Sequence, residues 1–328
     1  MGSRANAVVV NGGNRHVYYS HGAAQTLDAL ALYGPEFLLE EVQGWRDGRE
    51  DNPDWDGEWW LDNAFAEGGC CIDLDKKYLL LYGGDNAECD VLWLETYLKL
   101  LRYAWRGWTV EWSWGELGQI ARYAGVTGEK LEEIDWKYVE RPEGQFLNEY
   151  VDAQLGISRS LPYASSTLST TKRGLTKVAF TFESMPEKWL YIGDRIEKAF
   201  PSLGDAPLRY EDKDFLMGSI HFDFDSREIW LWRTWGTYVD VELSGFWNEW
   251  KLHDCRYDYR SFYRNVPRIV DFAGTSETDY VKRIASYVAG FASGGSAEDA
   301  RYKKERILSD VLAQYRNENP DPPLLPVI

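Results

Sequence analysis

Two segments of the chain show the same succession of apolar and polar positions. Residues 72–82 read IDLDKKYLLLY and residues 222–232 read FDFDSREIWLW, at an offset of 150. In each segment two short apolar runs flank a charged turn, a pattern that predicts a β-hairpin. The second run of each pair is apolar at successive positions, so we expect both hairpins to lie in sheets that are covered on both faces.

Helical periodicity flanks each hairpin on both sides. Upstream, Pro35 and Pro186 suit the first turn of a helix, where the missing N–H of proline costs nothing. Downstream, both segments carry apolar residues at the helical spacing of four, three and four positions. These residues are Leu94, Leu98, Leu101 and Trp105 in the first segment and Val239, Leu243, Phe246 and Trp250 in the second. We therefore predict helices over residues 35–46, 90–105, 186–200 and 239–250.

Each half of the chain then reads as strand, helix, hairpin, helix, strand. The outer strands are predicted at 15–20 and 108–114 in the first half, and at 177–183 and 253–259 in the second. Another hairpin is indicated by Gly12-Gly13 between Val8–Val10 and Arg15–Tyr19. The βαββαβ order is that of the ferredoxin-like pattern. We predict an α+β fold of two tandem related modules with antiparallel sheets, each with its helices on one face and its other face packed against the sister module.

The predicted elements divide the chain into four parts. The segment Gly156–Arg173 is rich in Ser and Thr and poor in charge, and is interpreted as a linker. Near the C-terminus, helical patterns at 277–291 and 297–317 precede a Pro-rich tail. The parts are 1–126, the first module with an acidic Trp-rich insertion at about 47–62; 127–173, a helical connection and linker; 174–266, the second module; and 267–328, C-terminal helices and tail.

Charge and composition narrow the class of protein. The 328 residues carry 53 acids and 36 Lys and Arg, a net charge of −17 with a pI near 4.8, which argues against a nucleic-acid footprint. The sequence contains neither an apolar run of about 18 residues nor a signal-peptide pattern, so we expect a cytoplasmic protein that does not engage a membrane. Cys70 and Cys71 would point to opposite faces of a strand, one in the core and the other half-exposed.

The acidity is concentrated in one region. Residues 36–90 contain 16 acids and four bases, a net charge of −12. Within this region, residues 47–62 read DGREDNPDWDGEWWLD, which combines seven acids with three tryptophans. Carboxylates steer a basic protein partner and aromatic side chains supply buried contacts. The candidate partner-binding residues are Asp51, Asp54, Trp55, Asp56, Glu58, Trp59 and Trp60; the alternative is a solvated connection whose tryptophans fold back onto the core.

A second group of residues suggests metal chemistry. His221, Asp223 and Asp225 alternate along a predicted strand, which would place them on one face. An imidazole and two carboxylates there could hold a divalent metal that activates water for hydrolysis. The alternative is that these side chains serve the turn and face solvent, because the first half carries Cys71, Asp73 and Asp75 at the same places.

These patterns favour a non-enzymatic protein without a cofactor. No nucleophile elbow, P-loop or dinucleotide-binding turn is present in the sequence. We expect an acidic protein-binding module, of the kind seen in an inhibitor or immunity protein that neutralises a basic partner such as a toxin. A metal-dependent hydrolase based on His221, Asp223 and Asp225 is one alternative, and a structural or assembly component is another. The sequence leaves the oligomeric state open.

Overall fold

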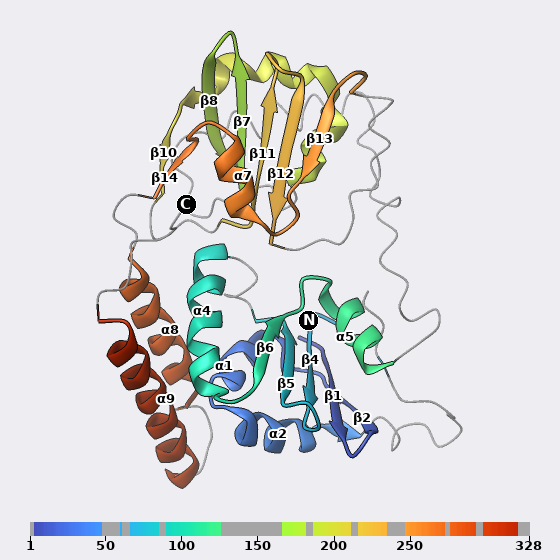
Figure 1. The fold of residues 1–328 in the computed structure, drawn as a ribbon, viewed down its shortest axis with the longest axis vertical. Coiled ribbons are helices and arrows are strands. Elements are labelled where there is room, and N and C mark those ends of the chain that lie inside the picture. The colour runs from blue at the N-terminus through green and yellow to red at the C-terminus, as the bar shows by residue number, and fades with distance from the viewer. Residues whose placement is uncertain are drawn as a thin grey trace. The chain divides into compact units, whose positions relative to one another are not determined.

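The computed structural model shows a mixed α+β protein with two compact units (Figure 1). It describes residues 3–47, 60, 66–84, 90–125, 166–181, 186–210, 216–234, 247–272, 276–292 and 298–320. The first unit takes its described residues from 3–84, 93–125 and 277–320, and the second from 90–92 and 166–276. Each unit contains one six-stranded sheet.

The sheet of the first unit has the order β3-β2-β1-β4-β5-β6. Its strands are β1 (Ala5–Asn11), β2 (Asn14–Ser20), β3 (Arg46–Asp47), β4 (Gly68–Asp73), β5 (Tyr78–Tyr82) and β6 (Thr109–Trp112). The pairs β1–β4 and β5–β6 are parallel, and the other neighbours are antiparallel. Every residue of β4 is buried, as expected for a strand at the centre of a covered sheet.

Helical elements cover this sheet on both faces. A Cβ built on Gly68 would lie 2.9 Å from the Ala24 Cβ of η1 (Ala24–Thr26), whereas one on Gly69 would lie 2.6 Å from Leu117 of α5 (Glu116–Ala124). Because successive residues of a strand point to opposite faces, η1 and α5 lie on opposite sides of β4. The remaining helices of this unit are α1 (Leu27–Ala31), α2 (Pro35–Gln43), α4 (Val91–Ala104), α8 (Glu277–Ala292) and α9 (Glu298–Glu318).

The sheet of the second unit has the equivalent strand order, β9-β8-β7-β11-β12-β13. Its strands are β7 (Ser166–Lys172), β8 (Leu175–Thr181), β9 (Gly204–Asp205), β11 (Gly218–Asp223), β12 (Glu228–Arg233) and β13 (Lys251–Asp254). Here too the third and fourth strands are parallel, and so are the last two. A separate parallel pair joins β10 (Leu208–Arg209) to β14 (Val270–Asp271).

The second sheet is also covered on both faces. A Cβ on Gly218 would lie 2.7 Å from Pro186 of η4 (Pro186–Ser202), while the neighbouring Ser219 bonds through its hydroxyl to Tyr263 of α7 (Tyr259–Asn265) at 3.1 Å. The η4 face carries the apolar core. That core contains Leu168, Trp189, Leu190, Ile192, Ile196, Leu203, Ile220, Phe222, Ile229, Leu231 and Trp247.

The strand arrangement corrects two predictions. The expected ferredoxin-like antiparallel sheets are not confirmed, because each sheet is mixed, with two parallel pairs. The predicted modules each began one strand too late: the hairpin indicated at Gly12-Gly13 contains β1 but was not counted in the first module, and β7 was not predicted. The expectation that helices cover one face only is also wrong, since α5 and α7 occupy the second face of their sheets.

Two segments of the second unit differ from their predicted structure. Part of the predicted linker, Ser166–Lys172, forms the central strand β7, and its Ser and Thr hydroxyls, other than that of Thr170, find partners within the sheet. The predicted strand at 253–259 is displaced, because β13 ends at Asp254 and α7 begins at Tyr259. The predicted helix at 239–250 lies outside the described residues except for a turn at 247–250.

The C-terminal helices belong to the first unit rather than to a part of their own. Their predicted ranges agree closely with α8 and α9. The Lys99 ammonium of α4 lies 2.5 Å from the buried Glu277 carboxylate at the start of α8, and the Tyr315 hydroxyl of α9 donates to the same carboxylate. A single buried carboxylate therefore connects three helices of this unit.

Each unit also contains a buried tryptophan that donates to a helix carbonyl. The Trp105 indole donates to the Ala31 carbonyl at 2.7 Å, and the Trp247 indole donates to the Leu190 carbonyl at 2.7 Å. In both units the acceptor lies three residues before a glycine with positive φ, Gly34 at 87° and Gly193 at 66°. These glycines end one helical segment and begin the next, and the Gly34 N–H also donates to the Ala31 carbonyl at 3.1 Å, so the Trp105 indole is a second donor to that oxygen at the helix break.

We predict that Trp105→Phe and Trp247→Phe each lower the free energy of unfolding by about 1 kcal/mol, because each removes a buried hydrogen bond from the indole to a helix carbonyl. Urea denaturation followed by circular dichroism measures the loss. Trp108→Phe is the matched control, since Trp108 packs edge-on against Trp105 but is only half-buried. Equal destabilisation by the control would contradict this role for the indole N–H.

Candidate functional site

The acidic Trp-rich segment lies largely outside the described residues. Of its seven candidate partner-binding residues, only Trp60 is described, and its side chain is 2% exposed. The other six, Asp51, Asp54, Trp55, Asp56, Glu58 and Trp59, fall in the range 48–59. The segment follows β3, which forms an edge of the first sheet, and precedes the central strand β4. The Trp60 side chain is thus part of the core, and the question of partner contact concerns the remaining six residues.

His221 lies on β11, in the interior of the second unit, where it is 1% exposed. Its Nδ1 is 2.9 Å from the Ser169 hydroxyl and its Nε2 is 3.3 Å from the Thr171 hydroxyl, both on the neighbouring strand β7. Burial lowers the pKa of His221 to about 4, against the opposing effect of Asp223. The imidazole is therefore neutral at pH 7 and bridges two hydroxyls of the adjacent strand.

The two carboxylates that follow His221 serve turns. Asp223 accepts from the backbone N–H groups of Asp225 at 2.9 Å and of residue 226 at 3.2 Å, within its own turn. Asp225 accepts at 2.7 Å from the N–H groups of both Arg173 and Gly174, in the turn between β7 and β8. These two hydrogen bonds lower the pKa of Asp225. Neither aspartate is directed at His221 as a co-ligand.

The first unit uses its aspartates in the same way. Asp73 accepts from the Lys76 N–H at 2.9 Å, within its own turn. Asp75 accepts at 2.8 Å from the N–H groups of Gly12 and Gly13, in the turn between β1 and β2. The repeated D-x-D pattern is thus a structural device: its first carboxylate closes one hairpin turn and its second holds the turn of the neighbouring hairpin.

The geometry gives no support to a metal centre at these residues. Across the part of the chain that the structure describes, no three His, Cys, Asp or Glu side chains are grouped so that they could hold a metal ion. His221, Asp223 and Asp225 share a strand, but each is engaged with a different partner. The alternative interpretation of the sequence, in which these side chains serve the turn, agrees with the hydrogen bonds of both aspartates; His221 is buried rather than solvated.

The vicinal cysteines offer no reactive thiol. Cys70 and Cys71 are both fully buried, whereas one was expected to be half-exposed. The reason is that β4 is covered on both faces, so both of its side-chain directions lead into the interior. Burial raises the pKa of both thiols, that of Cys71 to about 12, which keeps them protonated and unreactive.

A groove between α2 and α9 brings acidic and aromatic side chains together at the surface. It has a volume of about 400 Å³. Its lining residues are Phe37, Glu40, Glu41, Gly44 and Trp45 on the α2 side and Lys303 and Lys304 on α9. The Lys304 ammonium lies 5.1 Å from the centre of the Phe37 ring, so the two side chains form a cation–π contact within the groove. This groove was not predicted from the sequence, although Glu40-Glu41 followed by Trp45, just before the acidic segment, was a visible signal.

Comparison with protein family models, with curated proteins and with solved structures gives no match to this chain. Among the described residues, no helix has the length and apolar character needed to span a membrane.

We predict that His221 makes stability depend on pH between 6.5 and 4. Its pKa falls from an ordinary 6.5 to about 4 in the folded protein, so within this range the unfolded chain binds a proton that the folded chain does not. Stability is therefore complete above pH 6.5 and declines as the pH falls, by about 3 kcal/mol at the acid end.

Urea unfolding measured across this pH range tests the prediction as a difference between the wild type and His221→Gln, so that effects of the carboxylates cancel. The variant should lose most of the slope, whereas His21→Gln, at an exposed histidine, should keep it. Parallel slopes for the wild type and His221→Gln would show that the imidazole is accessible to protons in the folded state.

Proposed function

We propose that this protein is a non-enzymatic acidic binding protein that engages a basic protein partner through the first unit. The observation that carries the proposal is the location of the negative charge. Of the 16 acids between residues 36 and 90, Asp73, Asp75 and Asp90 serve the fold, because each accepts hydrogen bonds from backbone N–H groups. The remaining acids include a cluster on α2 and the acidic Trp-rich segment that follows it.

The acids of α2 are available at the surface. Glu36, Glu40 and Glu41 are exposed. The Glu40 carboxylate lies 4.0 Å from the Lys303 ammonium, and the Glu40 side chain is still 79% exposed. They lie within one helix that ends a few residues before the acidic segment begins. A basic partner would meet the exposed carboxylates of α2 together with those that follow in the sequence, with Trp45 and Phe37 of the groove as neighbouring aromatic contacts.

Comparison of the two units supports a specific role for this charge. The stretch from β3 to β4, residues 48–67, has a net charge of −6, whereas the stretch from β9 to β11, residues 206–217, is eight residues shorter and has a net charge of −1. The shared strand order does not require the acidic residues, because the second unit has the same order without them. We therefore attribute the additional negative charge of residues 48–67 to binding rather than to a role in folding.

We also infer that the two units descend from one duplicated module. The inference is supported by the common strand order, by the paired aspartates at 75 and 225, and by the paired tryptophans at 105 and 247. On this view the acidic segment is an addition to the first unit after duplication. Such an acidic surface suits an inhibitor or immunity protein, because its charge would steer the encounter with a basic toxin and weaken as salt rises.

We predict that Asp54/Asp56/Glu58→Lys abolishes partner capture. The full-length protein, immobilised, should retain a basic protein from extracts of the cell that makes it. Retention should fall as salt is raised from about 50 to 500 mM. The triple reversal should reduce retention on the order of tenfold or more, because it converts steering into repulsion.

Asp205/Asp279/Asp310→Lys provides the matched control, with the same change of charge at three exposed, scattered acids outside residues 36–90. It should retain the partner at nearly the wild-type level. Capture that is insensitive to salt, or that both triple variants reduce equally, would contradict the proposed site.

A further inference from the structure

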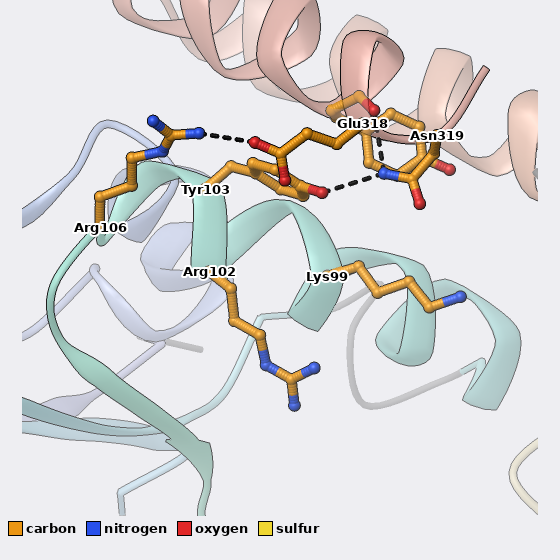
Figure 2. A pocket seen from close by; sticks show the side chains of 7 residues that line it. Lys99, Arg102, Tyr103, Arg106, Glu318 and Asn319 are labelled. Carbon is orange, nitrogen blue, oxygen red and sulfur yellow. Dashed lines mark hydrogen bonds and ion pairs between the residues drawn. The ribbon is translucent and has the colours of Figure 1, made fainter.

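A second pocket in the first unit has the opposite electrostatic character. It lies between α4 and α9 and has a volume of about 330 Å³, within the range of small-molecule sites. Figure 2 shows the side chains that line it. These are Lys99, Arg102, Tyr103 and Arg106 of α4, together with Tyr315, Glu318 and the adjoining Asn319 at the end of α9. Three cations from one helix therefore face a single pocket in a chain of net charge −17.

Two of the three cations are paired within the protein. Arg106 donates to the Glu318 carboxylate at 2.8 Å, and both side chains of this pair are more than half exposed. Lys99 lies 2.5 Å from Glu277, whose carboxylate is 1% exposed. Arg102 is exposed, and none of the residues that the structure describes forms an ion pair or hydrogen bond with its guanidinium. In Figure 2 its side chain extends clear of the Glu318 and Asn319 contacts.

The walls of the pocket are held in place by their own hydrogen bonds. The Asn319 amide donates at 2.9 Å to the Tyr103 hydroxyl and at 2.9 Å to the Tyr315 carbonyl. These bonds fix the end of α9 against α4, while the Tyr315 hydroxyl is held by Glu277. A ligand that enters would thus meet groups that are already ordered, which reduces the entropy lost on binding.

The framework that the two units share does not require these cations. The tryptophan pairs Trp105–Trp108 and Trp247–Trp250 relate the two units at an offset of 142, so Trp105 corresponds to Trp247 and not, as the sequence periodicity had predicted, to Trp250. At that offset the sequence carries Val241, Ser244 and Asn248 in place of Lys99, Arg102 and Arg106. The second unit therefore keeps the tryptophan arrangement without any of the three positive charges. Lys99 and Arg106 have partners on α8 and α9, but Arg102 has no such structural explanation.

We propose that this pocket binds a small molecule through an oxyanion group, a phosphate or a carboxylate, with Arg102 as the principal contact. The planar guanidinium offers paired N–H donors that match the geometry of either group. Lys99, about one-third exposed, adds positive charge at the same opening. Glu318 opposes the ligand, because its carboxylate occupies Arg106 and repels an anion at the rim. This site is independent of the acidic surface proposed for the protein partner.

The test is calorimetric titration of the full-length protein with inorganic phosphate, pyrophosphate and citrate, at an ionic strength held constant with sodium chloride. At least one of these probes should bind with a stoichiometry of one, and the preferred probe distinguishes a phosphate from a carboxylate ligand. Arg102→Gln should weaken its affinity on the order of tenfold or more, since it removes a charge-assisted contact. Glu318→Gln should strengthen binding, because it frees Arg106 and removes a negative charge.

Arg316→Gln is the matched control: it makes the same change of charge at an exposed residue of α9 that does not line the pocket. It should leave the affinity unchanged. The proposal would be overturned if the wild type bound none of the three probes, or if Arg102→Gln and Arg316→Gln weakened binding equally. Failure of Glu318→Gln to strengthen binding would likewise overturn the assigned arrangement of charges.

Discussion

The parallel pairing of the two central strands is the constraint on which the rest of each unit depends. β4 lies between β1 and β5 and is buried at every position, and β11 is buried at all but its last residue. A strand buried on both faces needs a layer on each side, which η1 and α5 provide in one unit and η4 and α7 in the other. It also tolerates a polar side chain only where a partner is at hand, as with His221 between two hydroxyls.

Parallel pairing also dictates where the chain can vary. Strands β1 and β4 are parallel and β2 is antiparallel to both, so the chain leaves β2 and enters β4 at the same end of the sheet but must pass from one side of β1 to the other. In the first unit this crossover contains α1, α2, β3 and the acidic Trp-rich segment. Once the helices cover the sheet, the rest of the crossover is free to change in length and charge. The eight additional residues before β4, compared with those before β11, follow from this freedom.

Local patterns predicted much of the structure from sequence. The helices α4, α8 and α9 and the hairpins β4–β5 and β11–β12 were found from periodicity, because their apolar spacing is regular. Strand β7 was missed, since its hydroxyl side chains resemble a linker and become buried only through partners on β8 and β11. The parallel pairs could not be predicted, because strand direction depends on contacts between distant segments. Because the parallel pairs were not predicted, the helical layer on the second face of each sheet was not predicted either.

The candidate sites show the same division between local and distant information. The acidic segment is visible in the sequence because its charges are consecutive, and its tryptophans cannot be sorted into core and surface without a structure, as the buried Trp60 illustrates. Lys99, Arg102 and Arg106 are spaced along one helical face, which the sequence also displays, but their meaning depends on what α8 and α9 place opposite them. Only that comparison singles out Arg102, the one of the three without a partner among the described residues.

Both the acidic excess and the basic pocket belong to the first unit, while the second repeats its framework without either. The framework therefore accounts for the fold, and the charges that distinguish the first unit are the basis of the two proposed binding sites.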